Sequence, residues 1–246
     1  MKGVILAGGL GTRLYPLTYA TNKHLLPVYD KPMIFYPIAT LVNSGITEIL
    51  VVVSGPHAGH FIRVLKNGKE LGVKHLEFAY QEKPDGGIAD ALSLSEDFAD
   101  NGNIAVILGD NTTDMDLKSA VKSFQKGALL FIKKIDDPHQ LKRFGVVVFD
   151  AKDPKKIAAI EEKPKIPKSN YVATGLYLYD AKVFDYIRSC KPSWRNELEI
   201  SDVNNQYIKD VSLSWTELTG FWSDCGTFET LFQANKYWAK KEVGRV

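Results

Sequence analysis

The first half of the chain alternates short apolar segments with longer amphipathic ones. The apolar segments are residues 3–7, 48–54, 76–81 and 104–108. Residues 49–53 are apolar at every position, as expected of a strand whose two faces are both covered. The amphipathic segments predict helices and lie at residues 32–45, 57–71, 88–98 and 117–126. This order predicts an α/β fold with a Rossmann-like, mostly parallel central sheet and helices on both faces.

The pattern changes after Lys126, where strand-like segments follow one another closely. They lie at residues 128–133, 144–150, 157–162 and 172–179. Helices are predicted at 181–190 and 197–208, a strand at 213–218 and a last helix at 228–246. This half predicts a smaller mixed β region against the parallel core. Because no linker or repeat interrupts the chain, we expect one domain over residues 1–246.

Composition and charge exclude several classes of function. The net charge is only +2 over 246 residues, which argues against a general nucleic-acid binder. The two cysteines, Cys190 and Cys225, lack metal-ligand spacing and indicate reduced thiols of a cytosolic protein. The apolar run at the start is too short for a signal-peptide core, and no later run reaches membrane-spanning length. We therefore expect a cytoplasmic protein that binds neither membranes nor nucleic acid.

A glycine-rich segment, residues 8–13, follows the first predicted strand. Glycines let backbone N–H groups approach a phosphate without a Cβ in the way. The segment is neither a Walker A loop nor a dinucleotide fingerprint, whose third glycine would fall at Leu14. Arg13 ends the segment and Lys23 follows ten residues later. Two cations beside such a loop suit phosphoryl or nucleotidyl transfer, although a structural turn with two solvated basic residues is the alternative.

Asp110 is predicted to lie at the carboxyl edge of the sheet, and Asp224 could supply a second carboxylate there if the fold brings the two together. Asp110 follows the apolar segment 104–108, and Asp224 lies in a second motif, residues 222–227. A carboxylate beside phosphates is a natural Mg²⁺ ligand, but turn and helix-cap roles are equally compatible with either residue alone. Asp114 and Asp116 are rival acids, which we interpret as caps of the helix that follows.

Several motifs together resemble the sugar nucleotidyltransferase family. They are G-G-x-G-T-R-L with a trailing K-x-L-L-P, then L-G-D-N, E-E-K-P, T-G-L-Y, R-N-E-L-E-I-S-D and W-x-D-x-G-T. The matches run in order from residue 1 to about residue 230. The resemblance implies the nucleotidyltransferase fold, with a nucleotide-binding half at residues 1–126 and a sugar-binding half at 127–246. It also implies that Asp110 and Asp224 bind Mg²⁺.

The resemblance assigns further roles residue by residue. Catalytic roles are implied for Arg13, Lys23 and Asp110. Nucleotide contacts are implied for Leu6, Gly8, Gly9, Gly11, Thr12, Arg13, Gln81, Gly87 and Asp110. Sugar phosphate contacts are implied for Asn111, Gly145, Glu162, Lys163, Tyr177 and Arg195. The family pattern departs at Asn196, where glycine is usual, and at Cys225, where threonine or alanine is usual.

Gln81 occupies the position at which the family has a glutamine that contacts the nucleotide base. Its amide can donate and accept at once, so it could pair with the N3–H and O4 edge of thymine or uracil. A glycine-containing segment follows, and either Gly86 or Gly87 could be the family's base-contacting glycine.

Within the family, the chain most resembles the short form of the enzymes that join glucose 1-phosphate to dTTP and release pyrophosphate. The longer members carry an additional C-terminal segment that contributes to an allosteric site. The alternatives are a UTP-dependent enzyme acting on glucose or an aminosugar 1-phosphate, and a non-catalytic sugar-nucleotide-binding regulatory subunit. A regulatory subunit would be expected to lack Arg13, Lys23 or Asp110. An oxidoreductase is excluded by the glycine spacing. The resemblance also implies a homo-oligomer.

Overall fold

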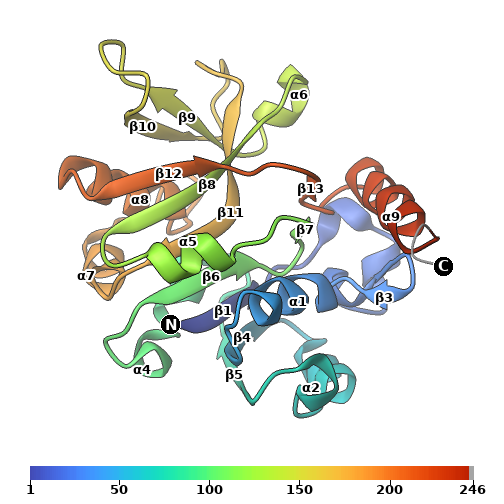
Figure 1. Cartoon of the computed structure of the whole chain (residues 1–246). Helices are drawn as coiled ribbons and strands as arrows, with labels where there is room; N and C mark the ends of the chain where they lie inside the picture. The colour runs from blue at the N-terminus through green and yellow to red at the C-terminus, as the bar shows by residue number, and fades with distance from the viewer. Residues whose placement is uncertain (244–246) are drawn as a thin grey trace.

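The computed structural model describes residues 1–243, and a nine-stranded sheet lies at the centre of this part (Figure 1). Its strands are β1 (Lys2–Ala7), β4 (Glu48–Ser54), β5 (His75–Gln81), β6 (Ile104–Leu108), β8 (Ala128–Lys134), β9 (Gly145–Phe149), β10 (Ile157–Glu162), β11 (Tyr171–Tyr179) and β12 (Leu213–Glu217). The order is β10-β9-β11-β6-β1-β4-β5, with β8 pairing both β11 and β12. Strands from both halves of the sequence therefore share one sheet.

The strands of the first half are parallel to one another. β1 pairs in parallel with β4 and β6, and β4 pairs in parallel with β5. Leu6 lies opposite Val52 on one side and Leu108 on the other. This register brings the carboxyl ends of the four strands to one edge of the sheet, where ligands bind in open α/β folds.

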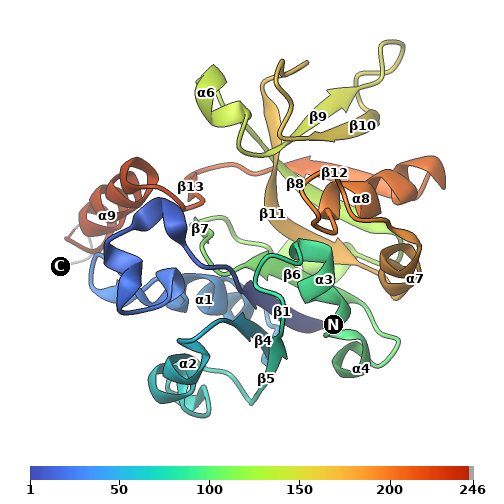
Figure 2. The same ribbon diagram turned by 180° about the vertical axis from the view of Figure 1, so that it is seen from behind.

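Helices cover both faces of the sheet (Figures 1 and 2). One face carries α1 (Phe35–Asn43), α2 (Ala58–Leu65) and α5 (Lys118–Ser123), and the other carries α3 (Ile88–Ser93), α4 (Glu96–Ala99), α7 (Lys182–Ser189) and α8 (Ile200–Lys209). Along β1, Val4 and Leu6 enter one apolar core while Ile5 and Ala7 enter the other. A strand buried on both faces has no polar positions, which confirms the prediction from the apolar runs.

The second half is mixed in direction. β11 is antiparallel to β6, β8 and β9, and β9 is antiparallel to β10, whereas β12 is parallel to β8. Two short ladders lie outside the main sheet: β2 (Pro27–Val28) pairs with β3 (Lys31–Pro32), and β7 (Thr112–Thr113) pairs with β13 (Trp222–Ser223). The other helices are α6 (Pro138–Leu141) and α9 (Phe228–Val243). Short 3₁₀ turns lie at Thr12–Leu14, Leu17–Tyr19, Lys23–Leu25 and Lys69–Leu71. The predicted α/β class with a mixed second region is confirmed.

Several helix boundaries differ from the sequence expectation. The helix expected at 57–71 ends at Leu65, because Lys66 has φ 50° and Gly68 has φ 73°, which no helix continues. The helix expected at 88–98 is split into α3 and α4. The helix expected at 197–208 begins only at Ile200, which leaves Glu197 and Glu199 in the preceding loop. The helix expected at 228–246 is observed to Val243, and residues 244–246 lie outside the described part.

None of the helices within residues 1–243 combines the length and the apolar character needed to cross a bilayer.

Candidate active site

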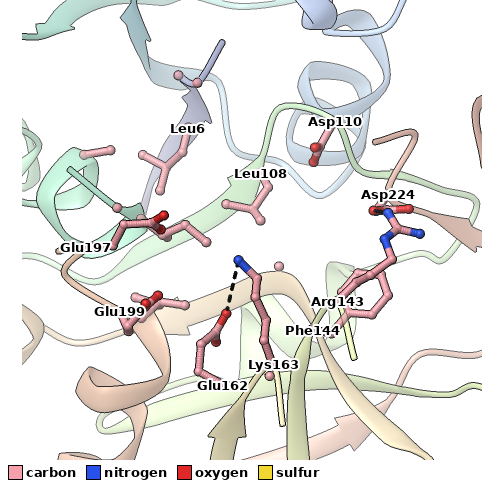
Figure 3. Close-up of a pocket in the computed structure, with 18 of the residues that line it drawn as sticks. Leu6, Leu108, Asp110, Arg143, Phe144, Glu162, Lys163, Glu197, Glu199 and Asp224 are labelled. Carbon is pink, nitrogen blue, oxygen red and sulfur yellow. Dashed lines mark hydrogen bonds and ion pairs between the residues drawn. The ribbon is translucent and has the colours of Figure 1, made fainter. Parts of the chain in front are cut away.

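A cavity of about 670 Å³ opens at the carboxyl edge of the parallel strands (Figure 3). Apart from Gly11, it is lined by every residue to which the sequence assigned a role. These are Leu6, Gly8, Gly9, Thr12, Arg13, Lys23, Gln81, Gly87, Asp110, Asn111, Gly145, Glu162, Lys163, Tyr177, Arg195 and Asp224. The fold thus brings together residues from both halves of the chain.

The glycine-rich loop is held against the ends of β4 and β5. The backbone N–H of Gly9 donates to Ser54 Oγ at 3.0 Å. A Cβ on Gly8 would lie 2.8 Å from Gln81 Oε1, so only glycine fits between the first strand and the end of β5. Gly11 lies outside the cavity. It has φ 65° and packs on Lys23, whose Cβ would be 3.0 Å from an added Cβ. The third glycine therefore shapes the loop around Lys23 and does not face the cavity.

Asp110 and Lys23 form a buried ion pair at the end of β6. Lys23 Nζ donates to Asp110 Oδ2 at 2.6 Å, and Asn111 Nδ2 donates to Asp110 Oδ1 at 3.0 Å. The aspartate is 7% exposed. Burial raises the pKa of Asp110, but the charges of Lys23 and His24 and the hydrogen bonds from Lys23 and Asn111 together outweigh it and hold this pKa below its usual range. Asp110 is therefore an anion at neutral pH, deep in the cavity.

Asp224 faces the same part of the cavity and contacts Arg143 (Figure 3). Burial and the negative charge of Asp110 raise the pKa of Asp224, while Arg143 and Arg13 oppose this shift. Asp224 Oδ1 is buried without a hydrogen-bond partner in the described part of the chain. Two anions close enough to disfavour each other, one with an unpartnered oxygen, fit a shared divalent cation.

Few side chains in the cavity could bind a metal ion. Residues 1–243 contain no group of three or more His, Cys, Asp or Glu side chains arranged to hold a metal. Mg²⁺, however, commonly binds through one or two carboxylates and completes its shell with water and substrate phosphate. The pair Asp110 and Asp224 fits that mode of binding, although each carboxylate now contacts a cationic side chain.

The β7–β13 ladder joins the two segments that carry Asp110 and Asp224. Trp222 lies on β13, two residues before Asp224, and its Nε1 donates to Asn111 Oδ1 at 2.6 Å. Asn111 in turn donates to Asp110, so a chain of hydrogen bonds joins the two aspartate-bearing segments. Asp114, a rival acid in the sequence, lies beyond this ladder and fastens α9 through Tyr237 and Lys241. Its contacts are structural, and it does not line the cavity.

Gln81 closes the base end of the predicted nucleotide site. Its Nε2 donates to Asp90 Oδ2 at 2.7 Å and lies 3.3 Å from the carbonyl oxygen of Gly87. Gly87 has φ 97°, and a Cβ there would lie 2.7 Å from the backbone nitrogen of Leu198. Of the two adjacent glycines, Gly87 lines the cavity and Gly86 does not. This supports the assignment of Gly87 as the base-contacting residue.

Three glutamates, Glu162, Glu197 and Glu199, also line the cavity (Figure 3). Glu197 and Glu199 flank Leu198, whose backbone packs against Gly87. Glu162 accepts a hydrogen bond from Ser201 Oγ at 2.5 Å, and its neighbour Lys163 lies 3.8 Å away. Arg195 is paired with Glu197 and Glu199, the latter through Nε at 3.0 Å. Arg195 lines the cavity with its guanidinium already bonded, so its predicted phosphate contact stays a prediction.

Asn196 lies in the loop before α8, between Arg195 and Glu197. Its φ of 60° lies in the left-handed region, which glycine and asparagine adopt most readily. The departure from the family's glycine is therefore accommodated by the backbone. Gly145 is constrained differently, because a Cβ there would lie 2.8 Å from Ser201 Oγ and 3.4 Å from Glu162 Oε2. Tyr177 also lines the cavity and is buried and stacked on Tyr179.

Glu162 should make stability depend on pH. Burial raises the pKa of Glu162 to about 6, against an ordinary value of 4.5. The folded protein therefore binds this proton more tightly, and its contribution to stability, fully present below pH 4.5, is lost as the pH rises through about 6. A Glu162→Gln variant stays neutral. We expect its melting temperature, relative to the wild type, to improve as the pH is raised from 4.5 to about 7.

The control for this prediction is Glu217→Gln, which removes one charge from an exposed position on β12. Because this variant keeps Glu162, the difference between its melting temperature and that of the wild type should show no step near pH 6. A constant difference between Glu162→Gln and the wild type across the range would contradict a raised pKa at Glu162.

Sequence reasoning missed three residues of this site. Arg143 contacts Asp224, and its only signal was a pair of cations, Lys142 and Arg143, directly before the predicted strand at 144. His24 is buried beside Asp110, and burial lowers the pKa of its ring to about 3. Asp90 holds the amide of Gln81. These residues act through neighbours that only the fold supplies.

An anion-cradling loop, two cations and two carboxylates in one cavity are the equipment of nucleotidyl transfer. A family model described as nucleotidyl transferase matches residues 2–241, and the chain belongs to this family. The chain is therefore a nucleotidyltransferase, as the sequence predicted.

Relatives of high sequence identity carry the name of one particular enzyme of this family. A glucose-1-phosphate thymidylyltransferase from Neisseria gonorrhoeae is 46% identical over 244 residues, which cover 96% of this chain and 82% of the relative. A protein of the same name from an Actinoplanes species is 45% identical over 242 residues, covering 96% and 78% of the two chains.

Solved structures agree with these relatives. One from Bacillus anthracis, assigned as a candidate glucose-1-phosphate thymidylyltransferase and bound to sucrose, superposes with a TM-score of 0.88 at 47% identity, covering 96% of this chain and 94% of that one. A UDP-glucose pyrophosphorylase superposes with a TM-score of 0.81 at 23% identity over 98% of each chain, which shows the shared fold alone.

Proposed function

We propose that the protein transfers a deoxythymidylyl group from dTTP to glucose 1-phosphate, giving dTDP-glucose and pyrophosphate. The observation that carries this proposal is the single cavity. Arg13, Lys23, Asp110 and Asp224 line it together with Gln81 and the three glutamates Glu162, Glu197 and Glu199. Relatives named for this reaction match almost the whole chain at 45–46% identity.

The proposed arrangement places dTTP over residues 1–126 and the sugar phosphate against residues 127–246. The loop N–H groups and Arg13 would hold the triphosphate, and Gln81 would meet the thymine edge. Glu162 would accept hydrogen bonds from sugar hydroxyls, because an anionic or neutral carboxyl oxygen accepts from O–H groups. Lys163, Tyr177 and the backbone at Gly145 would complete the sugar site.

The reaction is a direct displacement at phosphorus. An oxygen of the sugar phosphate attacks the α-phosphorus of dTTP, the new P–O bond forms, and the bond to the β-phosphate breaks as pyrophosphate leaves. The attacking group is already an anion, so no general base is needed. Lys23 and Lys163 would align the two anions, since holding reactants in line is a large part of such catalysis. Arg13 would offset the charge that gathers at the α-phosphate and leaving group.

Mg²⁺ is part of this proposal, held by Asp110 and Asp224, and when bound it would neutralise phosphate charge. Its binding would replace the present contacts of the two carboxylates with Lys23 and Arg143, which leaves both cations available to substrate phosphates. The expected homo-oligomer and the cytoplasmic location remain parts of the proposal that rest on the sequence.

The test is pyrophosphate release with Mg²⁺, glucose 1-phosphate and, separately, dTTP, UTP, dCTP, ATP and GTP. We expect release with dTTP well above UTP and none after chelation by EDTA, with recovery when Mg²⁺ is restored. Comparable release with dTTP and UTP would establish the UTP-dependent alternative as a second activity. If no nucleotide gives pyrophosphate release with glucose, glucosamine or N-acetylglucosamine 1-phosphate, the proposal is overturned in favour of a binding subunit.

A further inference from the structure

Asp90 lies behind Gln81 and outside the cavity. It belongs to α3, and its Oδ2 accepts a hydrogen bond from Gln81 Nε2 at 2.7 Å. The same nitrogen lies 3.3 Å from the carbonyl oxygen of Gly87. Gln81 itself is only 3% exposed. Its amide group is thus surrounded by two acceptors on one side and the cavity on the other.

Two acceptors fix which way this amide points. An ionised carboxylate and a backbone carbonyl can accept hydrogen bonds but cannot donate them. The amide nitrogen of Gln81 must therefore face Asp90 and Gly87, and both of its hydrogens are taken. The amide oxygen is left on the other side, toward Gly8, where an added Cβ would lie 2.8 Å from it. Gly8 and Gln81 both line the cavity, so the side chain offers the cavity an acceptor only.

Gly86 is the residue that makes room for this arrangement. A Cβ on Gly86 would lie 2.8 Å from Asp90 Cγ and closer still to its Oδ2. The double glycine therefore has two separate causes. Gly86 admits the carboxylate of Asp90, and Gly87 admits the backbone of Leu198.

We propose that Asp90 is a positioning residue that makes Gln81 present only its oxygen to the base, which selects pyrimidines that carry a hydrogen on ring N3. Thymine and uracil both donate from N3–H, so both satisfy this acceptor. Cytosine has a lone pair on N3, which would face the lone pairs of Gln81 Oε1 and leave two acceptors unpaired. The inference rests on the proposed function and refines it, because it replaces a glutamine that both donates and accepts with one that only accepts.

The experiment compares kcat/KM for dTTP, UTP and dCTP in the wild type and in Asp90→Asn. Asparagine has nearly the same shape but can also donate, so it permits the amide of Gln81 to turn over. We expect the ratio of kcat/KM for dTTP to that for dCTP to fall about tenfold, the size of one misplaced hydrogen bond. The ratio of dTTP to UTP should stay unchanged, because both bases carry N3–H. A general structural disturbance would not separate these two ratios.

Two further variants keep the test decisive. Gly86→Ala displaces the carboxylate of Asp90 without altering it, and should lower the dTTP to dCTP ratio in the same way even if Asp90→Asn does not fold. In a Gln81→Ala background, adding Asp90→Asn should leave the ratio unchanged, since Asp90 acts only through Gln81. The matched control is Asp97→Asn on the exposed side of α4, which should leave all three values at wild-type levels.

The outcomes separate this inference from the proposed function. If the wild type forms no dTDP-glucose, the proposed function is wrong. If the wild type is active and the ratio for dTTP and dCTP is the same in Asp90→Asn and Gly86→Ala, the positioning role of Asp90 is wrong while the activity stands. An equal change in the Gln81→Ala background would also overturn it.

Discussion

Replacing Asp110 by asparagine should lower kcat on the order of a thousandfold or more. The change removes one of the two neighbouring carboxylates in the cavity and leaves Lys23 without its ion-pair partner. Asparagine has the same size and can still accept from Asn111, so the loss should come from charge. Steady-state pyrophosphate release measures the effect, and the melting temperature shows that the variant is folded.

The matched control is Asp116→Asn, a nearby acid on the same segment whose side chain is exposed. Asp116 accepts a hydrogen bond from the backbone N–H of Lys118, which asparagine can also do. Its activity should stay near the wild-type level. Loss of one catalytic group commonly lowers turnover about a hundredfold or more. If Asp110→Asn retained more than about a tenth of wild-type turnover, Asp110 would therefore not belong to the catalytic centre.

Replacing Arg13 by alanine should lower kcat by about a hundredfold while changing the KM for dTTP much less. Arg13 lines the cavity beside the second aspartate segment, where its Nη2 would lie 3.1 Å from a Cβ added to Gly226. At that place a guanidinium can meet charge that develops as the bond to pyrophosphate breaks. Arg13→Lys should recover only part of kcat, because an ammonium keeps the charge but loses the planar fork.

Arg63→Ala, an exposed arginine on α2, controls for the loss of a cation and should leave both constants unchanged. A rise in KM with unchanged kcat in Arg13→Ala would mean that the residue binds dTTP without favouring the transition state. Such a result would remove Arg13 from the catalytic group and keep it among the nucleotide contacts.

The fold class could be predicted because its cause is local. A strand covered on both faces is apolar at every position, and the runs at 48–54 and 104–108 are observed as β4 and β6 with the same bounds. One rule, that parallel strands direct their carboxyl ends to one edge, predicted where the cavity lies, whereas the residues of the second half were implied by the family resemblance. Gln81 ends β5 and Asp110 follows β6 by two residues, as this rule requires.

Features that depend on residues distant in the chain could not be predicted from the sequence. The β7–β13 ladder is two residues long on each side, too short to leave a periodic pattern. The helix end at Leu65 depends on Lys66, a residue type that carries no signal for positive φ. Arg143 becomes important only because Asp224 lies beside it. The acceptor-only character of Gln81 depends on Asp90, nine residues later and folded back onto it.

The fastening of α9 has a consequence for the chain as it is synthesised. Asp224 sits just after β13, which pairs with β7, and α9 is held to the residue after that ladder by Tyr237 and Lys241 on Asp114. A nascent chain can form the glycine loop and the first parallel strands early, since domains begin to fold from their N-terminal parts as they emerge. The second carboxylate, Asp224, follows only once β13 has been synthesised and has paired with β7, and α9 then packs against that ladder through Asp114. The growing polypeptide would thus carry a nucleotide cradle long before it carries a complete catalytic centre.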